Sequence, residues 1–125
     1  MLNIGLGLAK DIAAISRRAG AEIMNIYQTD FDVQSKGDNS PVTKADQVAE
    51  DLIIRAIREG ITAEIPIVGE EAASAGDIPE INGRPFWLVD PLDGTKEFIT
   101  RNGEFTVNIA LIENGKPVLG VVHLP

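Results

Sequence analysis

The sequence predicts an α+β fold in which two amino-terminal helices pack on one mostly antiparallel sheet. Two observations support this prediction. Between Leu8 and Gly60, apolar residues recur every three or four positions, as they do in amphipathic helices. The remainder instead shows short apolar runs and alternation of apolar with polar residues, which are typical of strands. With 125 residues, of which 44% are hydrophobic and 24% charged, the chain can bury the core of one domain.

The two helices are predicted from their apolar stripes. The stripe of the first helix consists of Leu8, Ile12, Ile15, Ala19, Ile23 and Ile26. The second helix is expected to begin near Thr43, where Thr-Lys-Ala-Asp resembles a capping box and would place Asp46 in the first turn. Its end is expected at Gly60. Its buried side is expected to consist of Ala45, Ala49, Leu52 and Ala56.

The strands follow in the second half of the chain. Short apolar runs predict strands over Ile65–Val68 and Phe86–Val89. Alternation from Phe105 to Leu111 predicts a half-buried strand, and Asn114-Gly115 is a strong hairpin signal that leads into a returning strand over Pro117–Leu124.

Composition excludes several classes of function. The chain has no cysteine, so disulfides, thiolate nucleophiles and zinc–thiolate sites are absent, and a reducing cytoplasm is the expected compartment. Nineteen acids against eleven bases give a formal net charge of -8, which disfavours binding to nucleic acid or to an anionic membrane. Neither a signal peptide nor a membrane span is expected. Because the chain is acidic, an anionic substrate would need metal cations to reverse the local electrostatic field.

Acidic residues stand at the ends of two predicted strands. Glu70 follows the first, and Asp90 and Asp93 follow the second. If these strands are parallel neighbours, the three carboxylates converge at one edge of the sheet and would repel one another without a cation. Magnesium prefers such oxygen ligands, and the Leu92 carbonyl offers one more.

The residues after this acidic turn suggest phosphate chemistry. Gly94 and Thr95 offer backbone N–H groups to a phosphate at a predicted helical turn. The Thr95 hydroxyl would orient a water, with Asp46 as its base partner, which together describes a metal-assisted phosphoester hydrolase. On these residues alone, a solvated Asp-x-x-Asp-Gly turn remains equally compatible. Leu92 excludes an EF-hand, and no P-loop or dinucleotide fingerprint occurs.

Three segments resemble the signature of the inositol monophosphatase superfamily. They are Ser40-Pro41-Val42-Thr43-Lys44-Ala45-Asp46, Gly69-Glu70-Glu71, and Trp87-Leu88-Val89 followed by Asp90-Pro91-Leu92-Asp93-Gly94-Thr95. The continuation from Lys96 to Ala110 is similar to the bacterial 3′(2′),5′-bisphosphate nucleotidase branch. The resemblance implies a layered α/β, sugar-phosphatase-like fold and a Mg²⁺-dependent, lithium-sensitive phosphomonoesterase.

The resemblance also implies roles for individual residues. Glu70, Asp90, Asp93 and the Leu92 carbonyl would hold the metal, while Asp46 and Thr95 would activate the attacking water. Phosphate would be held by Gly94 and Thr95, with Lys36 contributing from a lid. The implied substrate is adenosine 3′,5′-bisphosphate, a small phosphate ester of sulfate assimilation that would yield AMP and phosphate. Inositol monophosphate is the alternative substrate.

One departure from the family pattern concerns a Trp-Asp-x-Ala motif in the second half of the family fold, whose aspartate completes the second metal site. The only tryptophan here is Trp87, which is followed by Leu88. Residues 1–125 are therefore expected to form the amino-terminal metal-binding and catalytic subdomain of a larger phosphatase, without a complete second domain. Expected partners are the phosphate ester, the remainder of the same chain and, as one option, a second copy in a homodimer. A non-catalytic metal-binding or assembly module is the alternative of a different class.

Overall fold

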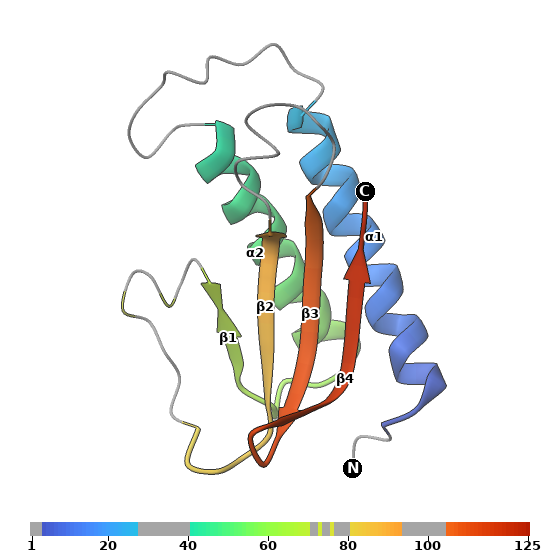
Figure 1. Ribbon diagram of the computed structural model, residues 1–125, viewed down its shortest axis with the longest axis vertical. Helices are drawn as coiled ribbons and strands as arrows, with labels where there is room; N and C mark the ends of the chain where they lie inside the picture. Colours follow the sequence, from blue (N-terminus) through green and yellow to red (C-terminus); the bar gives the residue numbers. More distant parts are fainter. Residues whose placement is uncertain (1–3, 28–40, 71–72, 74–75, 77–80, 94–104) are drawn as a thin grey trace.

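The sheet has four strands in the order β1-β2-β3-β4, with β1 and β2 parallel and the other pairs antiparallel (Figure 1). The computed structural model describes residues 4–27, 41–70, 73, 76, 81–93 and 105–125, with the backbone alone at 27, 41–44, 92 and 93. Its elements are α1 (Leu6–Tyr27), α2 (Pro41–Gly60), β1 (Ile67–Gly69), β2 (Phe86–Asp93), β3 (Thr106–Glu113) and β4 (Lys116–His123). The predicted fold, two helices on a mostly antiparallel sheet, is confirmed.

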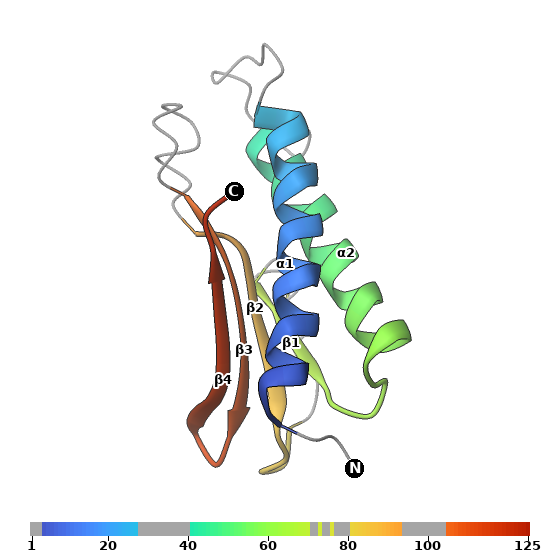
Figure 2. The same cartoon turned by 90° about the vertical axis from the view of Figure 1, so that its right-hand side faces the viewer.

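Both helices lie on the same face of the sheet, and the core lies between the two layers (Figures 1 and 2). Burial of apolar side chains drives this packing, because each helix has one apolar side and each strand of the central pair alternates. Within the described ranges, neither helix has a stretch long and apolar enough to cross a membrane. The buried apolar residues are Leu8, Ile12, Ile15, Ala19, Ile23, Ala45, Ala49, Ile53, Ile57, Ile67, Trp87, Val89, Phe105, Val107, Ile109 and Leu111.

Helix α1 buries the stripe that its sequence predicts, with Ile26 only partly buried at its end. The helix crosses β4 at a residue without a side chain. A Cβ on Gly20 would lie 2.9 Å from Cδ2 and 3.0 Å from Nε2 of His123. An alanine here would have to displace the ring of His123, so the glycine permits the close approach in which His123 packs against α1.

Helix α2 differs from its prediction in two respects. It begins at Pro41, not near Thr43, so the capping-box interpretation is wrong and Asp46 lies in the second turn. Proline suits the first helical position, where its fixed φ is helical and its missing N–H is not needed. Its buried side also continues through Ile53 and Ile57, which are fully buried, whereas the expected Leu52 and Ala56 are only partly so.

Strand β2 runs beyond its predicted end at Val89, as far as Asp93. Its pairing with β3 shifts by one residue between Asp90 and Asp93, so Pro91 and Leu92 stand opposite a single residue of β3. Such a bulge tolerates proline, because the extra residue makes no ladder hydrogen bond. The acidic turn that the sequence predicts is therefore a bulged strand end.

The hairpin between β3 and β4 forms where the sequence predicts it. Asn114 and Gly115 both have positive φ, 53° and 75°. Two successive residues in this region characterise the type I′ turn, whose twist matches that of the flanking strands.

Candidate metal and phosphate site

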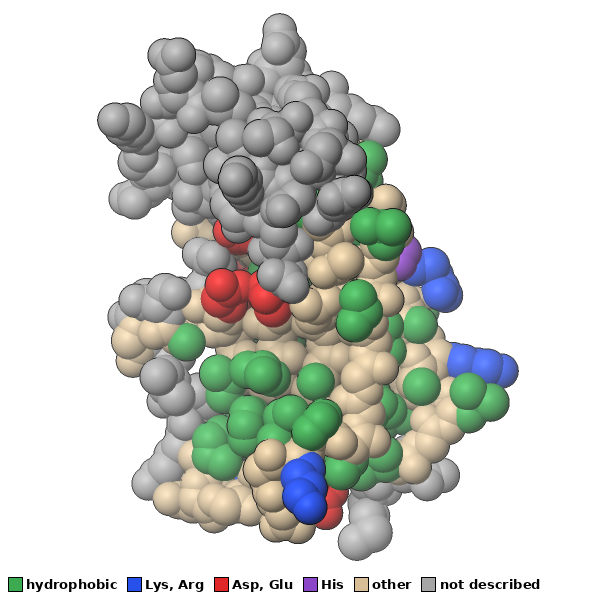
Figure 3. All heavy atoms as spheres, in the orientation of Figure 1, with side chains coloured by type: hydrophobic (Ala, Val, Ile, Leu, Met, Phe, Trp, Pro, Cys, Tyr) green, Lys and Arg blue, Asp and Glu red, His purple; other side chains and the backbone are tan. Residues whose placement is uncertain are grey.

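Two of the predicted metal ligands meet at the carboxyl ends of the parallel strands. Gly69 of β1 pairs with Val89 of β2, so Glu70 and Asp90 each follow the last pair on their strand. Both line one hollow of about 460 Å³, which also contacts Val68, Leu88 and other apolar residues. Figure 3 shows acidic side chains side by side on this face, next to a group of hydrophobic ones. The parallel arrangement that the convergence requires is confirmed.

The carboxylate of Asp90 has an unusual environment. Its Oδ1 atom is buried and has no hydrogen-bond partner among the described residues. A buried charged acceptor without a partner is unfavourable, and native proteins seldom leave one. A hard divalent cation in the same hollow would satisfy this oxygen, and the second carboxylate there belongs to the donor type that Mg²⁺ takes. The residues present thus fit the metal that the family resemblance implies.

The bulge sets the register of the third predicted acid. Asp90 pairs with Asn108, and Asp93 pairs with Thr106 two residues earlier on β3. In a regular antiparallel ladder, position 93 would instead stand opposite Phe105, which is buried in the core. The extra residue therefore brings positions 90 and 93 into register with the same set of alternating β3 residues, the set whose side chains are only partly buried.

Several predicted site residues lie outside the described part of the structure. These are Lys36, Gly94 and Thr95, together with the side chains of Leu92 and Asp93. Within the described side chains, no group of three or more acidic or histidine residues is placed to hold a metal ion. The structure thus brings Glu70 and Asp90 together and leaves the remaining ligands and the phosphate contacts as predictions.

The predicted base, Asp46, is buried on the side of α2 that faces the core, with a relative exposure of 9%. Glu50 follows one helical turn later and is more deeply buried, at 4%. Because residues four apart share one helix face, the two acids belong to one stripe with Ile53 and Ile57. The first half of α2 lies at the end of the molecule where β2 ends (Figures 1 and 2).

Glu50 is a buried acid beside the candidate site, and the sequence interpretation did not include it. Its carboxylate packs directly against Gly69, the residue before Glu70. The signal was present in the sequence, since an acid four residues after the predicted base must lie on the same helical face. A glutamate within an apolar-periodic helix would otherwise be assigned to the solvated side.

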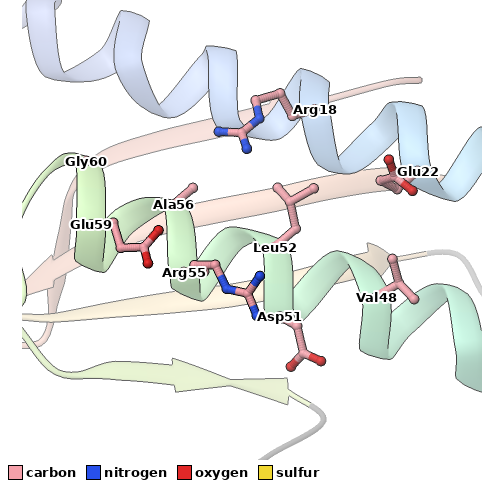
Figure 4. A pocket seen from close by; sticks show the side chains of 9 residues that line it. All are labelled: Arg18, Glu22, Val48, Asp51, Leu52, Arg55, Ala56, Glu59 and Gly60. Atoms are coloured by element: carbon pink, nitrogen blue, oxygen red, sulfur yellow. The ribbon is translucent and has the colours of Figure 1, made fainter.

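A hollow larger than the acidic one lies elsewhere. It measures about 570 Å³ and runs between α1 and α2 (Figure 4). Its charged lining residues include Arg18 and Glu22 of α1 and Arg55 and Glu59 of α2. None of the predicted site residues lines it. A further hollow of about 310 Å³ shares Leu88 and Asp90 with the acidic one and extends toward Val122 of β4.

Comparison with known proteins identifies the class. Residues 8–125 match the inositol monophosphatase family, and the chain belongs to that family. Among curated relatives, the 3′(2′),5′-bisphosphate nucleotidase CysQ of Escherichia coli strain K12 is 50% identical over 116 residues, which cover 91% of this chain and 46% of the relative. The CysQ of Haemophilus influenzae is 35% identical over 128 residues, covering the whole chain and 46% of the relative.

Solved structures agree with the fold. A crystal structure of CysQ from Bacteroides thetaiotaomicron superimposes with a TM-score of 0.79 at 40% identity, covering 98% of this chain and 44% of that one. An inositol monophosphatase from Zymomonas mobilis gives 0.78 at 34% identity, covering 98% and 45%. The chain therefore spans about half the length of the curated relatives and solved structures that it matches.

Proposed function

We propose that this chain is the metal-binding and catalytic amino-terminal part of a Mg²⁺-dependent phosphomonoesterase. The proposed reaction hydrolyses the 3′-phosphate of adenosine 3′,5′-bisphosphate to AMP and phosphate. The observation that carries the proposal is the partnerless Oδ1 of Asp90 in a hollow shared with Glu70. Sequence identities of 51% and 50% to bisphosphate nucleotidases support the choice of substrate.

Metal binding is assigned to oxygen atoms at the ends of β1 and β2. Glu70 and Asp90 contribute carboxylates from the two parallel strands, and Asp93 and the Leu92 carbonyl contribute from the bulged end of β2. When bound, Mg²⁺ supplies charge compensation for the phosphate oxygens and a more acidic water. A ligand set of this kind concentrates negative charge that a bound cation would neutralise, and the partnerless Oδ1 of Asp90 would be one of its ligands.

Water activation is assigned to Asp46 and Thr95. In this scheme the attacking water donates a hydrogen bond to the Thr95 hydroxyl oxygen, and the Thr95 hydroxyl donates to the Asp46 carboxylate. Thr95 takes a proton from the water and gives its own to Asp46 as the water oxygen bonds to phosphorus. The bond from phosphorus to the ribose 3′ oxygen breaks, and that oxygen takes a proton from solvent water to give the 3′-hydroxyl of AMP. The burial of Asp46 supports the role, because an acid shielded from bulk water is a more effective proton acceptor when its partner is fixed.

Phosphate binding is assigned to the backbone N–H groups of Gly94 and Thr95, with the Lys36 ammonium as a further contact. These donors are neutral or positive, which suits an anion held beside several carboxylates. Because the chain carries a net charge of -8, the phosphate would be repelled without such donors and the metal.

The test measures phosphate release from adenosine 3′,5′-bisphosphate by the natural gene product that contains this chain. We expect turnover that requires Mg²⁺, that stops when the metal is removed with EDTA, and that lithium inhibits. An inactive protein under these conditions would contradict the proposal. The localisation that fits this role is the cytoplasm, where the bisphosphate substrate would arise.

Inositol monophosphate is a second candidate substrate, favoured by the likeness to the inositol monophosphatase of Zymomonas mobilis. Assaying both esters side by side decides between them through the ratio of kcat/KM values. A non-catalytic assembly role is favoured by the exposed apolar residues Leu88, Val118 and Val122 on β2 and β4. A chimera in which this chain replaces the matching part of the Escherichia coli relative addresses that role. An inactive chimera would favour the non-catalytic module, because this chain would then not support catalysis even beside the remainder of an active enzyme.

A further inference from the structure

Glu50 packs against the backbone of β1 so closely that a side chain at position 69 would displace its carboxylate. A Cβ on Gly69 would lie 2.5 Å from Cδ of Glu50 and 2.7 Å from each of its carboxylate oxygens. Such distances are shorter than van der Waals contact, so an alanine at position 69 would displace the Glu50 carboxylate from its place against β1. Gly69 is not among the described residues with positive φ. The glycine therefore serves this close approach and not an unusual backbone conformation.

The stripe of α2 that carries Glu50 changes character along its length. Its second half consists of Ile53 and Ile57, both fully buried, and its first half consists of Asp46 and Glu50. Burying a carboxylate is unfavourable relative to burying an apolar side chain of similar size. A residue that served packing alone would be apolar here, as it is one and two turns later. The acid at position 50 must therefore be explained by what it contacts.

The contact joins the two elements that carry predicted catalytic groups. Gly69 is followed by Glu70, which lines the acidic hollow with Asp90. Glu50 lies one turn after Asp46 on α2. A side chain wedged between these two points fixes the end of β1 relative to the helix.

We propose that Glu50 is a positioning residue that sets the distance between the water-activating Asp46 and the metal ligand Glu70. Glu50 acts through packing and not through its charge, because its carboxylate fills the space beside Gly69 that a side chain would otherwise occupy. It holds the carboxyl end of β1 against α2. This inference rests on the proposed function, because it assigns Asp46 and Glu70 the roles given above. Groups that orient metal ligands typically change metal affinity or activity by roughly 10- to 100-fold when they are removed.

The experiment uses the natural gene product and measures kcat, KM and the Mg²⁺ concentration for half-maximal activity. Mg²⁺ affinity is also measured without substrate, by isothermal titration calorimetry, as a readout that does not depend on activity. The variants are Glu50→Ala, Glu50→Gln, Gly69→Ala and the Glu50→Ala/Gly69→Ala pair, with Glu59→Ala as the matched control on the exposed side of α2. Half-saturation by Mg²⁺ reports on the folded enzyme only. A residue that merely stabilised the fold would lower the amount of active protein and leave this concentration unchanged.

We expect Glu50→Ala and Gly69→Ala each to raise the half-saturating Mg²⁺ concentration about tenfold or more and to lower kcat. Glu50→Gln, which keeps the shape, should remain within about threefold of the wild type, and Glu59→Ala should not differ from it. The double variant should be no worse than Glu50→Ala alone, because the Cβ at position 69 then meets no carboxylate.

Two results would overturn the inference while the wild type is active. One is an unchanged Mg²⁺ requirement in Gly69→Ala, which tests the contact even if Glu50→Ala fails to fold. The other is a Glu50→Gln variant as defective as Glu50→Ala, since the charge and not the packed shape would then be responsible. An inactive wild type would instead refute the proposed function, so the two failures are distinguishable.

Discussion

Replacing Asp90 by asparagine should reverse the effect of Mg²⁺ on the stability of the protein. Asparagine keeps the shape of the side chain and removes its charge. Oδ1 of Asp90 is buried with no hydrogen-bond partner among the described residues. Leaving a buried polar group without a partner costs about 1–3 kcal/mol, and more for a charged group than for a neutral one. Because the side chain as a whole is only partly buried, the expected gain for the neutral amide is about 1 kcal/mol.

This difference converts into a measurable shift. For a chain of 125 residues, about 1 kcal/mol corresponds to roughly 4 °C in Tm. In the presence of Mg²⁺ at about one hundred times its Kd, the wild type gains about 2.7 kcal/mol, or roughly 10 °C, which the variant should lose. The variant should therefore melt above the wild type in EDTA and below it in saturating Mg²⁺.

The assay is thermal unfolding followed by circular dichroism, in EDTA and across a Mg²⁺ titration. Asp51→Asn is the matched control, because Asp51 is an exposed acid on α2 that lines the groove between the helices. The control should follow the wild type in both conditions. If Asp90→Asn melts below the wild type in EDTA and gains as much from Mg²⁺, the assignment of Asp90 to the metal is refuted.

Three further predictions concern the base, a close contact and the hairpin. Asp46→Asn should lower kcat by roughly 10²–10⁴-fold, as expected for loss of a general base, with little change in the fold; a kcat within threefold of the wild type would remove Asp46 from the proton path. Gly20→Ala should lower the free energy of unfolding in urea by about 1–3 kcal/mol, because its Cβ would lie 2.9 Å from the ring of His123. Truncating that ring in a second variant should restore the stability. Gly115→Ala should cost about 1–2 kcal/mol in the same titration because φ is 75° there; a neutral effect would mean that the turn rearranges freely.

Sequence patterns predicted the regular elements well, because each has a period that burial enforces. The stripe of α1 from Leu8 to Ile23 and the alternation of β3 both place apolar residues in the core. The hairpin at Asn114-Gly115 follows from local conformational preference alone. Such features depend on a few neighbouring residues, so they can be inferred without knowledge of tertiary contacts.

The less successful predictions concern features that depend on more distant contacts. Thr43 offered a plausible cap, but Pro41 also fits a helix start, and the local sequence does not decide between them. Pro91 suggested the end of a strand, whereas pairing with β3 carries β2 through a bulge to Asp93. Glu50 was not predicted because its role depends on Gly69, a residue nineteen positions away that it contacts only in the folded chain.

The departures from regular structure occur in the elements that form one end of the sheet. Their clustering there favours this end as the location of the functional site. Strand β2 is bulged after Asp90, β1 ends on a glycine whose space a carboxylate fills, and α2 carries acids in its buried stripe. Each feature is unfavourable for stability when considered alone, and proteins retain such features mainly at functional sites. The hollow between α1 and α2 is larger than the acidic one (Figure 4). It is lined, however, by exposed and partly buried residues of two regular helices, without comparable irregularities. Local irregularity, and not cavity size, therefore supports the proposal that the site lies at the end of the sheet near Glu70 and Asp90.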